Sequence, residues 1–489
     1  MELTQLINSV KAIQVIGEVQ RKDVSGIYYD SRKVIKNSIF VAIKGYNTDG
    51  HKYILDAVNK GAIAIVLEDN SSIPDDVFIL GKITKILVEN SRIALAEISN
   101  SFFKEPSRKL KLIGITGTNG KTTTSYFIKS ILEASGAKVG LVGTVSNSIG
   151  NMVINSNLTT PESSDMNELL NKMVKQECTY AITEVSSHSL VLNRVDELYF
   201  SAAVFTNITS DHLDFHLTFE NYLKAKKILF DSLRDSAFGV YNCDDLNSPI
   251  LIENSKAMLF SYGTTSSADF ILKNINFDLN GTSFIVEYNS KDYTVSTSLI
   301  GAFNAYNACG AFAVSVLMGV DENIAVEGIK NTKQVPGRFE VLGKENKKVV
   351  IDYSHTADSL EKALLSIKKI INNDQPVYTV FGCGGNRDKT KRPIMGKIAV
   401  NLSKSAIITS DNPRFEDPFS IIEDIKKGID KENYQVIENR EEAIKYAIEN
   451  AEENAVILIA GKGHENYQEI NGKRNHFSDK EIAEKYLNR

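Results

Sequence analysis

The stretch KLIGITGTNGKTTTSYFIKSILEAS, residues 111–135, decides the fold. It consists of an apolar strand, a glycine-rich loop and an amphipathic helix. Gly117 and Gly120 lie in the loop, and Lys121 and Thr122 follow at the predicted start of the helix. In such a unit the backbone N–H groups of the loop face phosphate oxygens, and the positive end of the helix favours anions. The stretch therefore predicts a phosphate site at the edge of a mostly parallel sheet.

The loop departs from the usual GxxxxGK[ST] pattern at one position. That pattern requires glycine at position 115, where this chain has Ile115, and a glycine stands at Gly117 instead. A glycine-rich turn with an incidental lysine is the alternative. The strand before the loop and the helix after it favour phosphate binding, with Lys121 neutralising the terminal phosphates and the Thr122 hydroxyl reaching Mg²⁺.

Length and composition limit the classes of protein to which the chain can belong. A chain of 489 residues predicts about three domains, and its strand–loop–helix series divide at 1–108, 109–335 and 336–489. The net charge of −5 argues against a nucleic-acid binder with a basic surface. The four cysteines form no CxxC pair, and neither a signal peptide nor a membrane span is apparent. We therefore expect a cytoplasmic, monomeric α/β protein without membrane insertion.

The middle series changes character near its end. Short alternating strands are predicted at 270–277, 283–288 and 293–299, and Asn280-Gly281 is a hairpin signal between the first two. A long apolar helix is expected at 299–319. Elsewhere the suspected polar clusters come directly after apolar strands, which in open parallel sheets is where ligands bind.

The loop sequence TGTNGKTT closely resembles the phosphate loop of the Mur ligases, in which the glycine is displaced in the same way. Folylpolyglutamate synthases share a related loop. The resemblance extends over essentially the whole chain. It implies three α/β domains: an N-terminal UDP-substrate domain, a central P-loop-type ATPase domain with added short strands, and a C-terminal Rossmann-like domain. The implied activity is an ATP-dependent ligase that forms amide bonds.

The resemblance also assigns ATP and Mg²⁺ ligands. Glu184 ends an apolar strand, where a carboxylate can bind Mg²⁺. By resemblance, the other Mg²⁺ ligands are Thr122, His212 and an N-carbamylated Lys226. From the pattern alone, Lys224 and Lys227 are candidates equal to Lys226. Asp352 and His355 are expected to order the site, although the family's DYAHTPD here contains Ser354 and Ala357. The expected ATP-binding residues are Gly117, Thr118, Asn119, Gly120, Lys121, Thr122, Thr123, Asn304, Asn307 and Arg338.

Two further groups of residues are assigned to substrates. The implied UDP-substrate residues are Tyr29, Ser31, Thr159, Thr160, Ser186 and Arg194, and a polar loop, 46–51, follows the strand SIFVAIKG. The implied amino-acid residues are Arg387, Asp411, Asn412, Pro413, Arg414, Gly461 and Glu465. The segment DNPR resembles the family's diaminopimelate signature, and a plain loop turn is the alternative. Arg414 matches a distal carboxylate and Glu465 a distal ammonium, so together they distinguish diaminopimelate from lysine.

The expected reaction follows from these assignments. A phosphoryl group passes from ATP to the D-glutamyl γ-carboxylate of UDP-N-acetylmuramoyl-L-alanyl-D-glutamate, and meso-diaminopimelate then displaces phosphate to form an amide. One alternative is a sister ligase that uses L-lysine, meso-lanthionine or folate glutamates. The other is a non-catalytic nucleotide-binding switch, which would require lost metal ligands or a blank acceptor pocket.

Overall fold

The structure is a computed structural model that describes residues 1–45, 48–156, 158–278, 280–343, 347–371 and 375–488. The chain folds into two compact units, each made of separate segments. The first contains 1–114, 137–203 and 231–237, and the second contains 115–136, 204–230 and 238–489. This division passes through two strands of the central sheet, so the domain bounds expected from the sequence stay a prediction.

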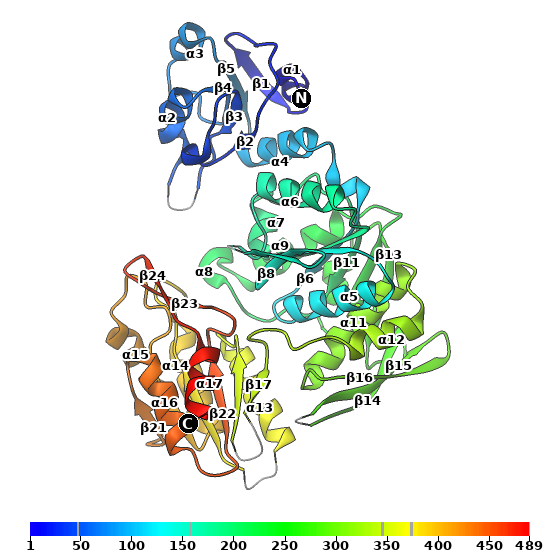
Figure 1. The fold of residues 1–489 in the computed structure, drawn as a ribbon, viewed down its shortest axis with the longest axis vertical. Helices are drawn as coiled ribbons and strands as arrows, with labels where there is room; N and C mark the ends of the chain where they lie inside the picture. The colour runs from blue at the N-terminus through cyan, green and yellow to red at the C-terminus, as the bar shows by residue number, and fades with distance from the viewer. Residues whose placement is uncertain (46–47, 157, 279, 344–346, 372–374, 489) are drawn as a thin grey trace. The chain divides into compact units, whose positions relative to one another are not determined.

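The first sheet has five strands in the order β1-β5-β4-β3-β2 (Figure 1). Strands β2, β3, β4 and β5 are parallel to one another, and β1 is antiparallel to β5. Every residue of β3, β4 and β5 is buried, because apolar cores cover both faces of the sheet. The elements are α1 (Leu3–Ile7), β1 (Ala12–Ile16), β2 (Ile27–Tyr28), β3 (Ser38–Val41), α2 (Ile54–Asn59), β4 (Ala62–Leu67), α3 (Asp75–Gly81), β5 (Thr84–Val88) and α4 (Ser91–Phe102).

The central sheet has eleven strands in the order β16-β15-β14-β13-β12-β11-β6-β10-β7-β8-β9. The strands are β6 (Lys111–Thr116), β7 (Val139–Val142), β8 (Ser146–Ile149), β9 (Met152–Asn155), β10 (Tyr180–Glu184), β11 (Phe200–Phe205), β12 (Phe238–Asn242), β13 (Met258–Gly263), β14 (Phe270–Asp278), β15 (Gly281–Tyr288) and β16 (Lys291–Thr297). The last three are the predicted short strands. They form an antiparallel meander in which Asp278 pairs with Gly281, which confirms the predicted hairpin.

Helices connect these strands. They are α5 (Lys121–Ala134), α6 (Ser163–Lys175), α7 (Ser187–Val191), α8 (Leu213–His216), α9 (Phe219–Asp231), α10 (Ser248–Ile252), α11 (Ala302–Leu317) and α12 (Glu322–Lys330). Helix α5 starts directly after the glycine-rich loop and packs against α11 and α12 (Figure 1). The predicted strand–loop–helix unit is therefore confirmed as β6, its loop and α5.

The third sheet has the order β17-β18-β22-β19-β20-β21, parallel except for β17. Apolar clusters again cover both of its faces. A separate hairpin pairs β23 with β24. The elements are β17 (Glu340–Leu342), β18 (Lys348–Asp352), α13 (Ala357–Ile370), β19 (Val377–Phe381), α14 (Lys391–Leu402), β20 (Ser405–Ile408), α15 (Pro418–Lys426), β21 (Tyr434–Val436), α16 (Arg440–Asn450), β22 (Val456–Ala460), β23 (Tyr467–Ile470), β24 (Lys473–His476) and α17 (Asp479–Leu487).

A buried ion pair fixes the end of strand β22. The Arg440 guanidinium donates from Nε and Nη2 to the two carboxylate oxygens of Asp479, each at 2.8 Å, and Nη2 also donates to the Ala460 carbonyl at 2.9 Å. Both side chains are fully buried. Because removal of one partner would leave a buried charge unpaired, this pair holds α16, α17 and the end of β22 in one arrangement.

Among the described residues, we find no helix with the length and apolar character that crossing a bilayer requires.

Candidate active site

The structure gives a reason for the displaced glycine of the phosphate loop. Ile115 is a fully buried residue of β6, so position 115 still belongs to the strand. The loop turns at Gly117 and Gly120, whose φ angles are +150° and +88°. A β-carbon at Gly120 would collide with the Asn307 side chain, and one at Gly117 would collide with the Thr206 hydroxyl. Backbone conformation and close packing therefore both require glycine at these two positions.

The loop is fastened to the chain that follows strand β11. Asn207 accepts from the backbone N–H of Thr118 through its carbonyl, at 2.8 Å, and from that of Asn119 through its side chain, at 3.1 Å. Its amide donates back to the Asn119 carbonyl at 3.1 Å, and the Thr206 hydroxyl donates to the same oxygen at 2.6 Å. The sequence suggested a polar cluster here, and the structure shows that Asn207 holds the shape of the loop.

Two lysine side chains meet at one carbonyl oxygen of the loop. Lys121 Nζ and Lys226 Nζ each donate to the Gly117 oxygen at 2.8 Å. Lys226 is 1% exposed and lies over the Tyr222 ring, 4.6 Å from its centre. Burial, reinforced by the charge of Lys121, lowers the pKa of Lys226 well below its ordinary value. By contrast, Lys224 is exposed and pairs with Glu220, so it does not share this environment.

Asp211 and His212, predicted after strand β11, lie beside His355. The backbone of His212 is left-handed, with φ of +54°, and its ring nitrogen is 3.5 Å from the Asp211 carboxylate. Burial would raise the pKa of Asp211, but the nearby His212, His355 and Lys391 outweigh it and lower that pKa. Burial, with the charge of Lys391, lowers the pKa of His355. His355 Nδ1 contacts the Tyr353 carbonyl at 2.9 Å.

Arg338 reaches the start of helix α5. Its Nη2 donates to the Thr122 hydroxyl at 3.3 Å, and its guanidinium stacks on Tyr353, 4.5 Å from the ring centre. Asp352 accepts from the backbone N–H of Phe339 at 2.8 Å, so it orders the segment that carries Arg338. Burial raises the pKa of Asp352.

The departure from the DYAHTPD pattern has a local explanation. Ser354 donates its hydroxyl hydrogen bond to Asp352. Ala357 is the first residue of α13, which begins with a capping box formed by Thr356 and Ser359. The loop is therefore ordered by side-chain hydrogen bonds without the proline of the family pattern.

Asn304 and Asn307 lie on one face of helix α11, as their spacing predicted. Asn307 Nδ2 donates to Asn304 Oδ1 at 3.2 Å, and Asn304 donates to the Ile300 carbonyl at 2.9 Å. Both are buried, and the Asn307 side chain faces Gly120 of the phosphate loop. The structure thus brings both asparagines close to the loop.

A second polar cluster surrounds Glu184, which ends strand β10. Its carboxylate accepts from the Thr144 backbone N–H at 2.9 Å and from the Thr144 hydroxyl at 2.8 Å. The Thr160 hydroxyl donates to the Glu184 carbonyl at 2.8 Å and accepts from the Ser186 N–H at 3.1 Å. Thr159 contacts Thr144 at 3.1 Å between hydroxyl oxygens. Four predicted residues therefore come together, and sequence reasoning missed Thr144, which follows the apolar strand β7.

Arg194 joins this cluster through its Nη1, which donates to the Thr160 carbonyl at 3.2 Å. Its Nε lies 2.9 Å from Glu162, whose carboxylate also pairs with Arg92 of α4 at 3.2 Å. Close by, the Tyr29 hydroxyl donates to Asp165 at 2.6 Å, and burial together with Asp165 raises the pKa of Tyr29.

The remaining predicted residues of the N-terminal stretch have structural contacts. Ser31 is buried, and its carbonyl accepts from Lys60 at 3.0 Å. His51 of the polar loop is buried, with Nδ1 2.6 Å from Asp49 and Nε2 accepting from two backbone N–H groups. Tyr46 and Asn47 lie outside the described residues.

The predicted amino-acid residues meet at the carboxyl ends of β20 and β22. Asn412 Nδ2 donates to Glu465 Oε2 at 2.8 Å, and Lys462 Nζ donates to the same oxygen at 3.0 Å. Gly461 has φ of +114° and faces the Asp411 carboxylate. Burial, and the neighbouring Asp411, raise the pKa of Glu465.

Arg414 is held in a strained backbone conformation, with φ of +52°. Its N–H donates to the Glu469 carbonyl at 3.0 Å, and its Nη1 donates to the Gly385 carbonyl at 2.8 Å. Arg387 is exposed on the loop that follows Gly385, and both arginines lie beside Gly384; Pro413 packs its carbonyl against Gly385. The structure thus gathers Asp411, Asn412, Pro413, Arg414, Gly461 and Glu465, with Arg387 on the exposed side.

Sequence reasoning missed Arg392, which anchors this loop. The side chain is fully buried, and it donates to Glu416 at 3.1 Å, to Asp424 at 3.0 Å and to the Gly384 carbonyl at 3.2 Å. The hydrogen bond from Arg392 is the main reason why the pKa of Glu416 falls to about 2. Arg392 lies in the segment KTKRP, where no local pattern distinguishes it from the neighbouring lysines.

Among the described residues, no group of three or more histidine, cysteine, aspartate or glutamate side chains converges as a metal site.

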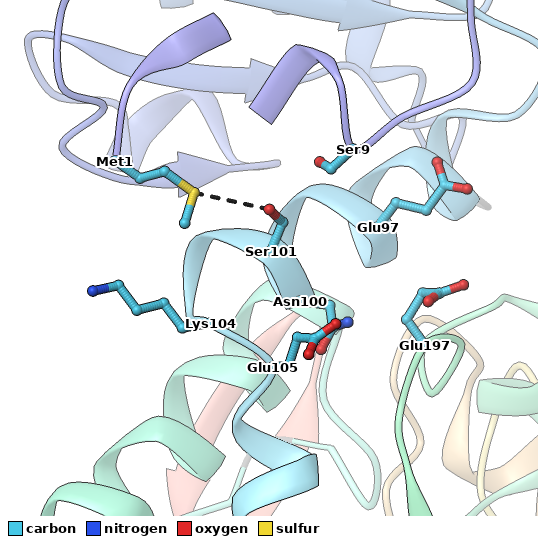
Figure 2. A pocket seen from close by; sticks show the side chains of 8 residues that line it. All are labelled: Met1, Ser9, Glu97, Asn100, Ser101, Lys104, Glu105 and Glu197. Carbon is cyan, nitrogen blue, oxygen red and sulfur yellow. Dashed lines mark hydrogen bonds between the residues drawn. The ribbon is translucent and has the colours of Figure 1, made fainter. Parts of the chain in front are cut away.

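A pocket of about 490 Å³ lies apart from the predicted residues (Figure 2). It is lined by Met1, Ser9, Glu97, Asn100, Ser101, Lys104, Glu105 and Glu197. Burial, with Glu197 next, raises the pKa of Glu97. Glu105 pairs with Arg108 at 3.3 Å, and Lys104 is the basic residue of the lining.

We expect Gly120→Ala to weaken the binding of a fluorescent ATP analogue roughly tenfold or more, because alanine disfavours this φ and would strike Asn307. Gly136→Ala is the matched control: its φ is +84°, yet no atom lies within 4 Å of the added carbon. It should lose a similar stability and keep nucleotide affinity. Equal loss of affinity in both variants, measured by titration, would contradict the assigned role of the loop.

Comparison with known proteins agrees with this geometry. Three family profiles match: "Mur ligase family, catalytic domain" at residues 23–103, "Mur ligase middle domain" at 115–315 and "Mur ligase, glutamate ligase domain" at 337–463. The chain is 44% identical to UDP-N-acetylmuramoyl-L-alanyl-D-glutamate–2,6-diaminopimelate ligase 1 of Clostridium acetobutylicum, over 100% of this chain and 99% of the relative. It is 42% identical to the ligase of that name, without the numeral, from Clostridioides difficile, over 100% of both.

A solved structure of a UDP-N-acetylmuramoyl-L-alanyl-D-glutamate–2,6-diaminopimelate ligase is also similar. It shares 31% identity and a TM-score of 0.69, over 99% of this chain and 98% of that one. The similarity therefore covers all three sheets rather than the phosphate loop alone. The chain belongs to the Mur ligase family.

Proposed function

We propose that this chain is an ATP-dependent ligase that joins meso-diaminopimelate to the D-glutamyl γ-carboxylate of UDP-N-acetylmuramoyl-L-alanyl-D-glutamate. The observation that supports the proposal is the hydrogen bond from Asn412 to Glu465, with Arg414 two residues further along the same loop and bonded to the Gly385 carbonyl. A guanidinium and a carboxylate on these neighbouring segments match the carboxylate and the ammonium at the far end of diaminopimelate. The names of the full-length relatives support the same substrates.

The phosphate loop supports ATP as the phosphoryl donor. Lys121, and Arg338 beside Thr122, offer positive charge where the terminal phosphates would lie. Asn307, which faces Gly120, and Asn304, which is hydrogen-bonded to Asn307, are proposed to contact the nucleoside. The other proposed contacts are with the loop, namely Gly117, Thr118, Asn119 and Thr123. Positioning and charge neutralisation are what phosphoryl transfer chiefly requires of a protein.

Mg²⁺ fits the donors present, although three acidic or imidazole groups do not converge among the described residues. This ion keeps several waters and takes one or two carboxylates together with substrate phosphates. The Glu184 carboxylate, which is buried and oriented by Thr144, and the Thr122 hydroxyl are two of its proposed ligands. When bound, Mg²⁺ neutralises the charge that develops on the phosphates. His212 and a carbamylated Lys226 complete the proposed ligand set.

The surroundings of Lys226 favour its carbamylation. Its lowered pKa provides the neutral amine, which adds to CO₂ with release of one proton and gives an anionic carbamate. The added oxygens would lie near one donor, because Lys121 and Lys226 donate to the same Gly117 carbonyl. The change removes a repelled cation from the site and supplies an oxygen ligand.

The chemistry then runs in two steps. The γ-carboxylate of the UDP-substrate attacks the γ-phosphorus of ATP, and ADP leaves to give an acyl phosphate. The free amine of diaminopimelate attacks the acyl carbon, a proton is lost, and inorganic phosphate departs as the amide forms. Asp352 and His355 act by ordering the site, since both are engaged by Phe339, Ser354 and Tyr353.

Binding of the UDP-substrate is assigned to the first two stretches of the chain. The proposed residues are Tyr29, Ser31, Thr159, Thr160, Ser186 and Arg194, and the proposed domains are 1–108, 109–335 and 336–489. The cluster around Glu184 supports this, because three of these residues, Thr160, Ser186 and Arg194, are linked by hydrogen bonds to it or to one another. Thr159 contacts Thr144, which donates to the Glu184 carboxylate. We place the reaction in the cytoplasm, where the four free cysteines remain reduced.

The proposal is tested by measuring ADP release with all combinations of the three substrates. We expect turnover only when the UDP-dipeptide and meso-diaminopimelate are both present. Nucleotide binding without turnover would indicate a switch protein. Faster turnover with L-lysine than with meso-diaminopimelate would indicate a sister ligase.

We expect Lys226→Ala to be inactive and to be partly rescued by formate or acetate, because a small carboxylate replaces the lost carbamate oxygens. In the unsubstituted protein, ¹³C-bicarbonate should produce a carbamate signal by NMR. Lys224→Ala, which removes an exposed lysine from the same helix, is the control and should retain both the signal and the activity. A missing carbamate signal in the active protein would refute the modification.

We expect Arg414→Ala to lower kcat/KM for meso-diaminopimelate by an amount equivalent to roughly 2–5 kcal/mol, because the distal carboxylate loses its charged partner. L-Lysine lacks that carboxylate, so its poor use should change little. Arg474→Ala is the control: Arg474 and Arg414 lie 3.9 and 3.8 Å from the same Glu469 carboxylate, but Arg474 is the more exposed. An equal loss for both amino acids would show that Arg414 does not read the distal carboxylate.

A further inference from the structure

Lys462 is a fully buried lysine that forms an ion pair with Glu465. Its Nζ donates to Glu465 Oε2 at 3.0 Å and to Asn412 Oδ1 at 3.1 Å, and it lies 3.9 Å from Asp411 Oδ1. The aromatic ring of Tyr467 closes another side, with Nζ 5.4 Å from its centre. A buried lysine with one directly bonded carboxylate and one bonded amide has a fixed position.

The hydrogen bonds among Lys462, Asn412 and Glu465 engage one carboxylate oxygen of Glu465. Asn412 and Lys462 both donate to Oε2 of Glu465, so within the described residues Oε1 accepts no hydrogen bond. Asn412 Oδ1 in turn accepts from Lys462 and from the Glu469 backbone N–H at 2.9 Å, which links the group to strand β23. The geometry therefore leaves one oxygen of Glu465 for an incoming donor.

We propose that Lys462 is a positioning residue, which holds Glu465 and Asn412 as one unit and keeps Glu465 ionised for the distal ammonium of the amino-acid substrate. The inference rests on the proposed function, in which Glu465 receives that ammonium. It assigns to Lys462 a role that requires no contact with the substrate.

Charge supports this role as well as geometry. Burial and Asp411 both raise the pKa of Glu465, whereas Lys462 lowers it. The other ionisable groups that face Glu465 are Tyr353, Tyr467 and Arg440, and the charge of Arg440 is already engaged by Asp479. Among the described residues, Lys462 is thus the one cation hydrogen-bonded to Glu465.

The direction of the pH effect follows. Without Lys462, the hydrogen bond from Asn412 remains to oppose burial and Asp411, which both raise the pKa of Glu465. The carboxyl group of Glu465 then binds a proton at a pH at which the unsubstituted protein keeps it ionised. A protonated Glu465 cannot pair with the ammonium. The loss of diaminopimelate binding should therefore be greatest at low pH and should shrink as pH rises.

The test compares Lys462→Met, Glu465→Gln and the double variant, with Lys404→Met as a surface control that removes a half-exposed lysine. Steady-state kinetics between pH 6 and 8.5 give KM for each substrate. In Lys462→Met we expect KM for meso-diaminopimelate to rise roughly tenfold at pH 6.5, the factor that corresponds to one pKa unit, and to recover toward pH 8.5. KM for ATP and for the UDP-substrate should not change.

The double variant separates coupling from general damage. If Lys462 acts through Glu465, the double variant should have the same KM for diaminopimelate as Glu465→Gln alone, and removal of both charges should restore part of the lost thermal stability. A KM that rises equally at every pH, or effects of the two substitutions that add, would overturn the inference. An unchanged KM in Glu465→Gln would instead refute the proposed function of Glu465 itself.

Discussion

Two lysine side chains share the carbonyl oxygen of Gly117, and much of the site depends on this arrangement. Lys121 and Lys226 both donate to that oxygen at 2.8 Å, and Lys226 is buried. Because like charges repel strongly in a poorly solvated site, the arrangement requires either a neutral amine or incoming anions. Phosphate groups at Lys121 and a carbamate at Lys226 would each satisfy it. Positive charge at this position favours the binding of the anionic phosphates that a phosphoryl-transfer site must hold.

The loop that holds these lysines has little freedom of its own. Glycines at 117 and 120 leave room for Thr206 and Asn307, and Asn207 bonds to the loop backbone on both sides of Thr118. Rigid placement of backbone donors reduces the reorganisation that nucleotide binding would otherwise require. The glycine is displaced because strand β6 continues through Ile115 and Thr116, so the loop turns first at Gly117.

The amino-acid pocket uses buried charges in the same way. Arg392 holds the loop of Gly384 through Glu416 and Asp424, Arg440 fixes the end of β22 through Asp479, and Lys462 holds Glu465. Each cation is fully buried and is balanced by a carboxylate. Of these carboxylates, Glu465 is the one proposed to contact the substrate. Such pairs fix the positions of the segments they join more than they stabilise the fold, because the cost of desolvation offsets most of their attraction. A site that binds two charged ends of one molecule requires side chains in fixed positions.

The sequence by itself determined the strand–loop–helix unit at 111–135, the short strands near 280 and the polar residues after each strand, because hydrophobic period and glycine placement are local signals. It also suggested Arg414 and Glu465 through a local motif. Only the tertiary structure decided which lysine of 224, 226 and 227 is a buried amine beside the loop, and which residues hold the motifs in place. Thr144, Asn207, Arg392 and Lys462 act on segments distant in the chain, and a side chain's burial and charge partners depend on how those segments pack, which no local pattern records.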